Sequence, residues 1–395
     1  MTRLLLLTLV ATATLPIGCL AGAAEPITIG EINSRTGILA AQGRAVAQGI
    51  RIAVDMANQA GGVAGRPVRL LERDDEGKPE RAVAAAEELT ARHRVAALLG
   101  GYVDSLVGPV SEVAERARTP YVATASLDER LTQRGYRYFF RVSSLSPYVS
   151  ATVGLLRDVI RPQRVAILYS STPGATQLAR RQKEALTAAA IGVPVFEPFS
   201  PGLADFTPLL ARIRDAGAEV LLSDAFFADH LLIVRQMAQS GVRVRGFLGA
   251  FGLEFPAVIR ELEGAAEGLL GTTAWQPGVY VPGAPAESQA FTDAYRARFG
   301  QEPVPLSMHG YAAARALFAA AGAAAASAQP LGGEPLREAL ARVDVDTPLG
   351  RVRFDGRGDP LFYERVIVQV QERRHVVVYP LAAATARLLY PRPTP

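Results

Sequence analysis

The sequence predicts an α/β protein of two lobes, each built on a parallel sheet, and three observations lead to that prediction. Short apolar strands alternate with amphipathic helices over most of the chain, as they do in doubly wound sheets. The alternation restarts near Tyr148, so the same pattern occurs twice. The chain has 395 residues and is 49% hydrophobic, which is enough to bury two cores.

The N-terminal segment has the pattern of a secretory signal peptide. Arg3 supplies the positive end, Leu4 to Leu15 the apolar core, and Ala21-Gly22-Ala23 a small-residue cleavage site. The apolar run is interrupted by Pro16 and is short for a membrane span. We therefore expect residues 1–23 to be removed and the mature chain to lie in the periplasm.

Cys19 is the single cysteine of the chain, and it lies inside the expected signal peptide. Lipid anchoring at Cys19 is the alternative, but Pro16 stands where such cleavage motifs usually carry Leu, so we do not expect it. The mature chain would then contain no cysteine. This excludes a disulfide framework and a cysteine nucleophile.

The charges do not indicate a nucleic-acid-binding surface. Lys and Arg together number 42 and Asp and Glu 38, and only Lys78 and Lys183 are lysines. Nucleic-acid binding requires basic residues clustered on one face, whereas these arginines are scattered. The pairs Arg180-Arg181 and Arg373-Arg374 are typical of solvated helix or turn faces.

The first half of the chain predicts a parallel sheet covered by helices. Val46, Ile50, Ala53 and Ala57 recur at helical spacing, and Gly61-Gly62 ends that helix. The expected elements are strand 27–30, a helix ending at 60, strand 67–72, helix 82–92, strand 95–99, helix 106–117 and strand 121–125.

The second half repeats this order without visible sequence identity to the first. The expected elements are helix 149–159, strand 165–169, helix 177–190, strand 193–196, helix 206–215, strand 220–222, helix 231–239 and strand 247–248. Helices 288–299 and 311–326 and strands 350–354, 366–370 and 375–379 follow. We expect the proline-rich tail Pro391–Pro395 to be disordered.

No catalytic, nucleotide-binding or metal-binding motif occurs in the sequence. A nucleophile elbow, a phosphate-binding loop and an H-E-x-x-H helix are all missing, and Gly100-Gly101 does not extend to a dinucleotide fingerprint. His93, His230, His309 and His375 are separated from one another, so we expect surface or packed histidines. We expect no cofactor, no metal and no enzymatic activity.

Segments at the ends of the expected strands could face a common cleft, because ligands bind at the carboxyl ends of strands in open α/β sheets. They carry backbone amides, small hydroxyl residues and aromatics, which suit a small polar or amphiphilic ligand. Ser105 begins a helix, so we expect it to cap that helix, to bind a carboxylate, or to do both. The segments are 36–43, 101–105, 123–127, 170–174, 224–227 and 249–252.

Three stretches resemble one family over essentially the whole mature chain, the periplasmic substrate-binding proteins of branched-chain amino acid ABC transporters. The resemblance implies a type I periplasmic-binding fold, with two Rossmann-like lobes, three hinge crossings and a ligand enclosed between the lobes. The stretches are "ITIGEINSRTGILAAQGRAVAQGIRIAVDMANQAGGVAGRPVRLLERDDEGKPERAV", "PYVATASLDERLTQRGYRYFFRV" and "EGLLGTTAW".

The family's fold also implies where the chain changes lobe. We expect crossings at Ser143–Pro147, Thr273–Pro277 and Asp346–Gly350. This assigns residues 24–145 and 276–348 to lobe 1, residues 146–275 and 349–382 to lobe 2, and residues 383–395 to a C-terminal tail.

The resemblance implies a carboxylate site on the first lobe. Ser105 matches a family Ser, and Ala125, Ser126 and Leu127 fall on a triplet in which Leu127 replaces a hydroxyl donor. Gln42 stands where the family often has an aromatic, and Pro173 where it has a Tyr. The other expected ligand contacts are Tyr102, Phe226, Phe227, Phe251 and Trp275.

The largest departure from the family concerns the ammonium group of an amino-acid ligand. The family's acidic turn reads Gly249-Ala250-Phe251-Gly252, and Phe251 cannot form a salt bridge with an ammonium. We therefore expect a carboxylate without an α-amino group, aromatic or aliphatic in its body. In the alternatives, Asp224 or Asp104 restores the missing charge, or the aromatics are core residues.

The leading functional hypothesis is a solute binder that delivers a small amino-acid-like or carboxylate ligand to an ABC permease, acting as a monomer without nucleic acid. A ligand sensor on the same fold is the second hypothesis, and the genes beside its own would separate the two. A secreted enzyme is the third, and we disfavour it because the sequence offers no nucleophile or metal set.

Overall fold

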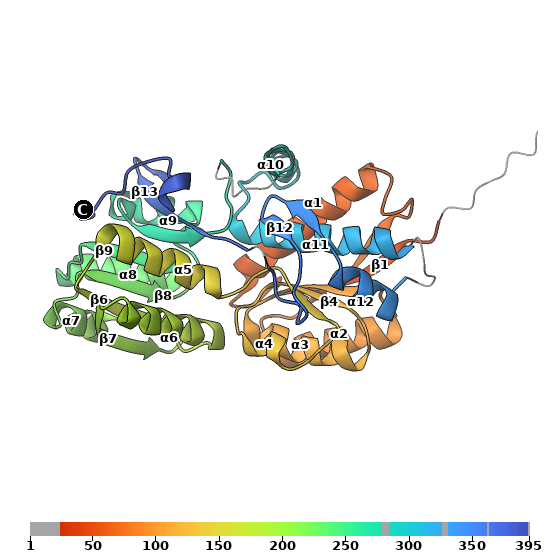
Figure 1. The fold of residues 1–395 in the computed structure, drawn as a ribbon, viewed down its shortest axis with the longest axis horizontal. Coiled ribbons are helices and arrows are strands. Elements are labelled where there is room, and N and C mark those ends of the chain that lie inside the picture. The colour runs from red at the N-terminus through yellow and green to blue at the C-terminus, as the bar shows by residue number, and fades with distance from the viewer. Residues whose placement is uncertain (1–23, 279–283, 326–330, 362, 394–395) are drawn as a thin grey trace, which may run out of the picture.

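The computed structural model describes residues 24–393, apart from residues 279–283, 326–330 and 362. Two lobes lie side by side, and the chain passes between them at their junction (Figure 1). The expected signal peptide lies outside the described residues. Within the described ranges, no helix combines the length and the apolar character needed to cross a bilayer.

Lobe 1 contains a sheet of five parallel strands, as the alternating pattern predicted. Its central strand β3 is buried along its whole length, which explains the continuous apolar run in the sequence. In spatial order the strands are β2 (Val68–Asp74), β1 (Ile27–Asn33), β3 (Ala97–Tyr102), β4 (Tyr121–Ala125) and β5 (Phe139–Arg141).

Helices cover both faces of the lobe 1 sheet, and each face has its own apolar core. On one face lie α1 (Ala40–Gln59), α10 (Pro285–Phe299), α11 (Pro305–Ala325) and α12 (Gly333–Ala341). On the other face lie α2 (Pro79–Glu87) with its π-helical extension η1 (Glu88–Arg92), α3 (Asp104–Arg116) and α4 (Arg130–Gln133).

Two glycines set the position of α11 relative to α1. A Cβ atom added at Gly49 would lie 1.7 Å from the carbonyl oxygen of Ser307, and one added at Gly310 would lie 2.2 Å from that of Val46. Only glycine allows the two backbones to approach this closely. The contact fixes the first turn of α11, which faces the junction between the lobes.

Lobe 2 contains a sheet of seven strands. Five neighbouring strands are parallel to one another, and the two strands nearest the C-terminus add to one edge by antiparallel pairing. In spatial order these are β14 (Arg374–Tyr379), β13 (Val366–Gln371), β10 (Leu270–Thr273), β9 (Gly246–Ala250), β8 (Val220–Asp224), β6 (Arg164–Ser170) and β7 (Gly192–Phe199).

The lobe 2 sheet is also covered on both faces. One core packs beneath α5 (Ser146–Leu155), its π-helical extension η2 (Leu156–Ile160) and α6 (Pro173–Ala188). The other packs beneath α7 (Thr207–Asp215), α8 (Phe227–Ser240), α9 (Pro256–Leu262) and the 3-10 turn η3 (Glu263–Ala266).

The chain changes lobe three times, and the third crossing differs from the expected position. The expected crossing Asp346–Gly350 instead belongs to a hairpin of β11 (Val345–Thr347) and β12 (Gly350–Val352). Leu349 and Phe354 are buried in the lobe 1 core, so the hairpin belongs to lobe 1. The chain enters the lobe 2 sheet only at the start of β13, and the expected boundary at residue 349 was therefore too early.

The C-terminal tail is packed, which corrects the expectation of disorder for its described residues, Pro391 to Pro393. The backbone amide of Arg392 donates to the carbonyl oxygen of Arg245 at 2.7 Å. The Tyr390 ring lies under the Arg245 guanidinium, 4.9 Å from its carbon to the ring centre. Aromatic and cationic side chains thus hold a segment whose proline content alone suggested a free end. A short 3-10 turn, η4 (Leu381–Ala383), precedes it.

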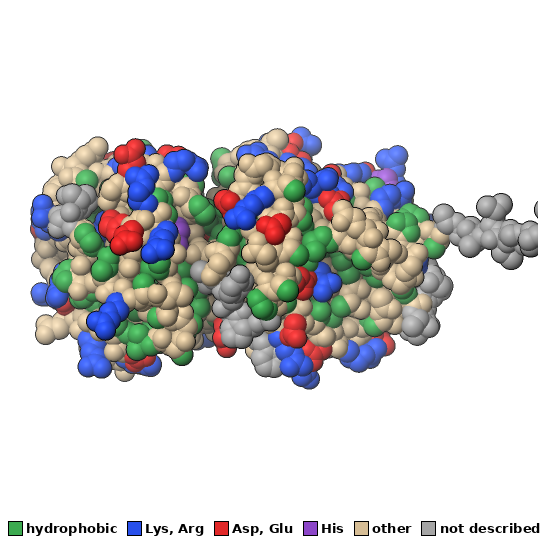
Figure 2. All heavy atoms as spheres, turned by 90° about the horizontal axis from the view of Figure 1, so that it is seen from above, with side chains coloured by type: hydrophobic (Ala, Val, Ile, Leu, Met, Phe, Trp, Pro, Cys, Tyr) green, Lys and Arg blue, Asp and Glu red, His purple; other side chains and the backbone are tan. Residues whose placement is uncertain are grey.

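The molecular surface is hollowed along the junction of the two lobes (Figure 2). Basic and acidic side chains are scattered over the face shown there, and neither sign gathers into a patch. This agrees with the scattered arginines in the sequence.

Candidate functional site

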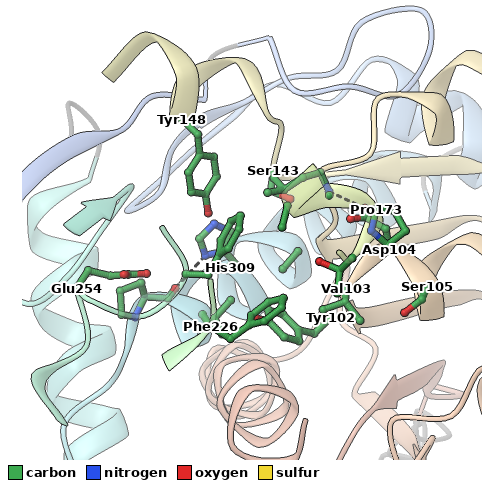
Figure 3. Close-up of a pocket in the computed structure, with 18 of the residues that line it drawn as sticks. Tyr102, Val103, Asp104, Ser105, Ser143, Tyr148, Pro173, Phe226, Glu254 and His309 are labelled. Atoms are coloured by element: carbon green, nitrogen blue, oxygen red, sulfur yellow. Dashed lines mark hydrogen bonds between the residues drawn. The ribbon is translucent and has the colours of Figure 1, made fainter. Parts of the chain in front are cut away.

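A cavity of about 60 Å³ lies between the lobes. Residues from lobe 1, from lobe 2 and from the crossings line it, including the ends of β3 and β4, the first turns of α3, α6 and α11, and the loops after β8 and β9. Tyr148 and His309 point into the same space, with Glu254 at one end and Asp104 and Pro173 at the other (Figure 3). The cavity thus has the interlobe position of a ligand site.

Three aromatic rings of lobe 2 form one wall of the cavity. The ring of Phe251 lies 5.3 Å from that of Tyr148 and 5.8 Å from that of Phe226, centre to centre, and the second pair is stacked. Phe251 directly follows β9 and has φ of +62°, a left-handed conformation that is uncommon for a bulky residue. Such outliers cluster at ligand sites. The wall offers an apolar surface to the flat or branched body of a ligand.

Arg365 brings a buried positive charge to the cavity. It lies on the third crossing, directly before β13, and is 6% exposed. Its Nη1 donates to the Tyr363 hydroxyl and its Nη2 to the carbonyl oxygen of Thr272 at 2.8 Å. Its Nε is buried and has no hydrogen-bond partner among the described residues, and Glu254 acts on the guanidinium through its charge without a hydrogen bond. Burial opposes the charge, yet the net pKa is raised because Tyr148, Tyr363 and Glu254 surround it.

A hydrogen-bonded chain connects Arg365 to lobe 1. His309 Nδ1 lies 2.9 Å from the Pro305 carbonyl oxygen, and its Nε2 lies 2.8 Å from the Tyr363 hydroxyl. Burial, together with the charge of Arg365, lowers the pKa of His309 to about 4, so the imidazole is neutral at pH 7. Nδ1 must then donate to Pro305, and Nε2 accepts from Tyr363, whose oxygen accepts from Arg365. These hydrogen bonds join α11 to the third crossing.

Glu254 is the carboxylate at the lobe 2 end of the cavity. It is 4% exposed and accepts a hydrogen bond from the backbone amide of Gly252 at 2.8 Å. Burial raises the pKa of Glu254 to about 7, against the opposing effect of Arg365. The cavity therefore contains an acid whose charge changes near neutral pH.

Asp104 closes the cavity at the other end. Its Oδ1 accepts from the backbone amides of Leu127 at 2.7 Å and Asp128 at 2.8 Å. A Cβ added at Gly174 of lobe 2 would lie 2.3 Å from Asp104 Oδ2, so the two lobes meet here in a closed arrangement. Burial raises the pKa of Asp104, while the two amides partly offset it.

Residues 26–373 match the profile of the family described as Periplasmic binding protein. The chain belongs to this periplasmic binding protein family. Leu/Ile/Val-binding protein homolog 8 of Brucella abortus is 26% identical over 382 residues, covering 92% of this chain and 93% of the relative.

Solved structures of similar fold include one of a leucine binding protein and one of a solute binding protein with benzoate bound. A leucine binding protein, LivK from Thermotoga maritima, has a TM-score of 0.79 at 24% identity and covers 90% of this chain and 99% of its own. An ABC transporter solute binding protein from R. palustris in complex with benzoate has a TM-score of 0.77 at 17% identity, covering 94% and 98%. At these identities the likenesses show the fold, and they confirm the predicted type I architecture.

Six of the expected ligand contacts of this periplasmic binding protein line the cavity. Ser105 is exposed and lies at the edge of the site, beyond Asp104 (Figure 3). It does not cap α3, which begins at Asp104 with Val103, at φ +70°, as the preceding residue. The six are Tyr102, Ser105, Ala125, Leu127, Phe226 and Phe251.

The other four expected contacts lie outside the cavity lining. Trp275 is fully buried in lobe 1, where its indole donates to Ser288 at 2.8 Å and packs against Phe291. The remaining three are Phe227, which stacks on Phe255 at 6.0 Å, Ser126, whose amide donates to Ser143 Oγ at 3.1 Å, and Gln42 in the first turn of α1.

The two acids that could replace the family's turn acid occupy different places. Asp104 lines the cavity, whereas Asp224 is fully buried at the end of β8, where its Oδ1 lies 3.4 Å from the Gln182 amide nitrogen. Leu127 belongs to the segment that the resemblance assigned to a ligand carboxylate, and its backbone amide donates to Asp104 Oδ1. One backbone amide of that segment is therefore engaged by a side chain of this protein.

Sequence reasoning missed several cavity residues, among them Tyr148, Glu254, His309 and Arg365. The sequence held a weak signal for one of them, because Glu254 follows the altered turn by only two residues. Across the described ranges, no group of three or more His, Cys, Asp or Glu side chains is arranged to hold a metal ion.

Proposed function

We propose that this protein is the extracytoplasmic solute-binding component of an ABC importer and captures a small carboxylate with an aromatic or branched aliphatic body. The observation that supports this most directly is the buried guanidinium of Arg365, which lines the cavity without a contacting carboxylate in the described chain. A ligand carboxylate would supply the missing partner.

The energetics of Arg365 favour an anionic ligand. A buried charge is costly unless it is paired and hydrogen-bonded. Two of the guanidinium nitrogens already donate to Tyr363 and Thr272, and Nε remains. Hydrogen bonds between charged groups are about twice as strong as neutral ones. A hydrogen bond to Arg365 therefore stabilises a bound carboxylate more than one to the Leu127 amide, which already donates to Asp104.

The body of the ligand would lie against the wall formed by Tyr148, Phe226 and Phe251. Offset aromatic contacts contribute about 0.5–1.5 kcal/mol beyond burial of apolar area. Phe251 also stands where an acid would pair an ammonium in amino-acid-binding relatives. The wall thus supports a carboxylate that lacks an α-amino group.

The test uses ligands that differ by a single group. L-Leucine and 4-methylpentanoate differ only in the α-ammonium group, and 4-methylpentanamide replaces the carboxylate by an uncharged amide. L-Phenylalanine and 3-phenylpropanoate form a second pair, with benzoate added. We expect the carboxylates to raise the melting temperature and to bind in calorimetry, because a ligand specific to the folded state stabilises it. Binding of leucine or phenylalanine in preference to its deaminated partner would overturn the proposed ligand class.

One observation favours a second candidate, an α-amino acid. Glu254 places a carboxylate in the cavity that, when ionised, could pair an ammonium. The name of the Brucella relative, Leu/Ile/Val-binding protein homolog 8, is compatible with this ligand, whereas the benzoate complex is compatible with the first. The same matched pairs separate the two candidates.

Delivery to a membrane permease is the remaining part of the proposal. It is supported by the family and by the importer proteins of similar fold. Secretion through the N-terminal signal and action as a monomer belong to it as well. Stimulation of ATP hydrolysis by the permease complex encoded beside this protein, in the presence of the ligand, would test delivery. A sensor kinase gene in that place would favour the sensing alternative.

A further inference from the structure

We propose that Glu254 selects the charge of the ligand by exchanging a proton with solvent, so that binding of a carboxylate without an ammonium group is accompanied by uptake of up to one proton at Glu254. This inference rests on the proposed function. The Glu254 carboxylate and one proton form a neutral carboxylic acid, and no other bond changes.

The geometry around Glu254 leaves its negative charge poorly compensated. Glu254 is 4% exposed, and its carboxyl group receives one hydrogen bond from a backbone amide, that of Gly252. Within the described chain, no basic side chain lies within 4.0 Å of it. Arg365 acts on it only from a longer distance. A ligand anion placed at Arg365 would take up that compensation and add a like charge to the same enclosed cavity.

Apart from Asp104, whose pKa is raised by burial, the groups that face Glu254 from the surrounding elements keep fixed charges near pH 7. Burial raises the pKa of each tyrosine among them, and His309 is neutral because burial lowers its pKa to about 4. Arg365 remains protonated, and Asp104 lies at the opposite end, bonded to two amides. These groups are Tyr102 of β3, Asp104 of α3, Tyr148 of α5, His309 of α11, and Tyr363 and Arg365 of the third crossing.

The direction of proton exchange follows from the ligand's charge. In the empty cavity Glu254 is partly ionised at pH 7, because its pKa lies near that value. A carboxylate raises this pKa further, so a proton is taken up, whereas an ammonium group would stabilise the ionised form and release one. A protonated Glu254 also has no charge to offer an ammonium. Protonation of Glu254 therefore favours binding of a carboxylate and disfavours binding of an amino acid.

Calorimetry in two buffers of low and high ionisation enthalpy tests the proposal, with 4-methylpentanoate and benzoate as probes. An ordinary carboxyl group has a pKa of about 4, so both probes stay ionised between pH 6 and 8. We expect the measured enthalpy to depend on the buffer in the sense of proton uptake. We also expect affinity to rise as the pH falls from 8 to 6, by at most about tenfold per pH unit for one linked proton.

Glu254→Gln should abolish both effects, since Gln is of nearly the same size and cannot titrate. Glu261→Gln is the matched control, because Glu261 lies in the last turn of the neighbouring helix α9 and outside the cavity lining of the described chain. It should retain proton uptake. Should E254Q not fold, the buffer dependence of the wild type decides alone.

Carboxylate binding without buffer dependence, proton release on carboxylate binding, or undiminished uptake in E254Q would each overturn the role of Glu254. If none of the carboxylates binds, the proposed function fails instead, so the two failures are distinguishable.

Discussion

The guanidinium carbon of Arg365 lies 3.5 Å from the centre of the Tyr148 ring, and both side chains line the interlobe cavity. Tyr148 belongs to α5 of lobe 2, whereas Arg365 belongs to the third crossing. A cation over an aromatic face is stabilised by the ring quadrupole, most strongly where water is excluded. The contact orients the guanidinium plane and keeps a charge beside an apolar wall.

Arg365→Lys should weaken carboxylate binding although it keeps the positive charge. Lysine has no planar fork to stack on Tyr148 while also donating to Tyr363 and Thr272. A lost hydrogen bond between charged groups costs about 1.5–3 kcal/mol, which corresponds to a loss of about 10- to 150-fold in affinity. Calorimetry with the carboxylate that binds the wild type most tightly measures this loss of affinity, and Arg374→Lys at an exposed position is the control. Unchanged affinity in R365K would refute the assigned role of Arg365.

Gly174→Ala should hinder closure of the lobes. The added methyl group would lie 2.3 Å from Asp104 Oδ2, well inside van der Waals contact. Overpacking costs about 1–3 kcal/mol, so we expect affinity to fall by about 5- to 150-fold. Small-angle scattering should also show less compaction on ligand addition. Gly264→Ala, which would meet no atom within 4 Å, is the control in the same lobe and should bind normally.

Glu254→Gln should stabilise the unliganded protein at alkaline pH. The folded-state pKa of Glu254 is raised from 4.5 to about 7, so the folded protein disfavours the ionised form. The wild type therefore loses stability as the pH rises from about 4.5 through 7, by an amount of order 3 kcal/mol, and glutamine removes that loss. Denaturant unfolding at pH 5 and pH 8 measures the difference. An equal effect of E254Q at both values would contradict the expected titration.

Asp359→Ala should destabilise the third crossing. Arg141 is 1% exposed and pairs with Asp359, which also accepts from the Thr132 hydroxyl. Breaking a buried ion pair typically costs about 3–5 kcal/mol, and the partial exposure of Asp359 reduces this to about 1–3 kcal/mol. Chemical denaturation measures this change in the free energy of unfolding. Asp215→Ala, which removes an exposed pair with Arg214, should change stability by less than about 0.5 kcal/mol.

The fold could be predicted because its signals are local. The apolar run near Leu98 and the helical spacing from Val46 to Ala57 depend only on neighbouring residues, and both appear in the structure as β3 and α1. The third crossing could not be placed in the same way. Strands of three residues, such as β11 and β12, have no periodicity of their own, and burial of Leu349 against lobe 1 decides where the chain turns.

The site was predictable where it follows from sheet topology. Tyr102, Leu127, Phe226 and Phe251 lie at or just beyond strand ends, which a parallel sheet brings to one edge. Arg365 reaches the cavity from a crossing, and its position depends on the path of the chain between lobes. The first turns of α5 and α11 supply Tyr148 and His309 for the same reason.

The aromatic wall, Glu254 and the Arg365–Tyr148 stack are all attached to the sheet and helices of lobe 2 or bonded to them. They would stay assembled when the lobes separate, whereas the bond from Tyr363 to His309 and the packing of Leu127 against Tyr148 and Phe251 connect them to lobe 1. A solute would then bind first to these preassembled residues of lobe 2, and lobe 1 would close over it. The order of encounter would be the reverse of one in which a carboxylate first docks on lobe 1.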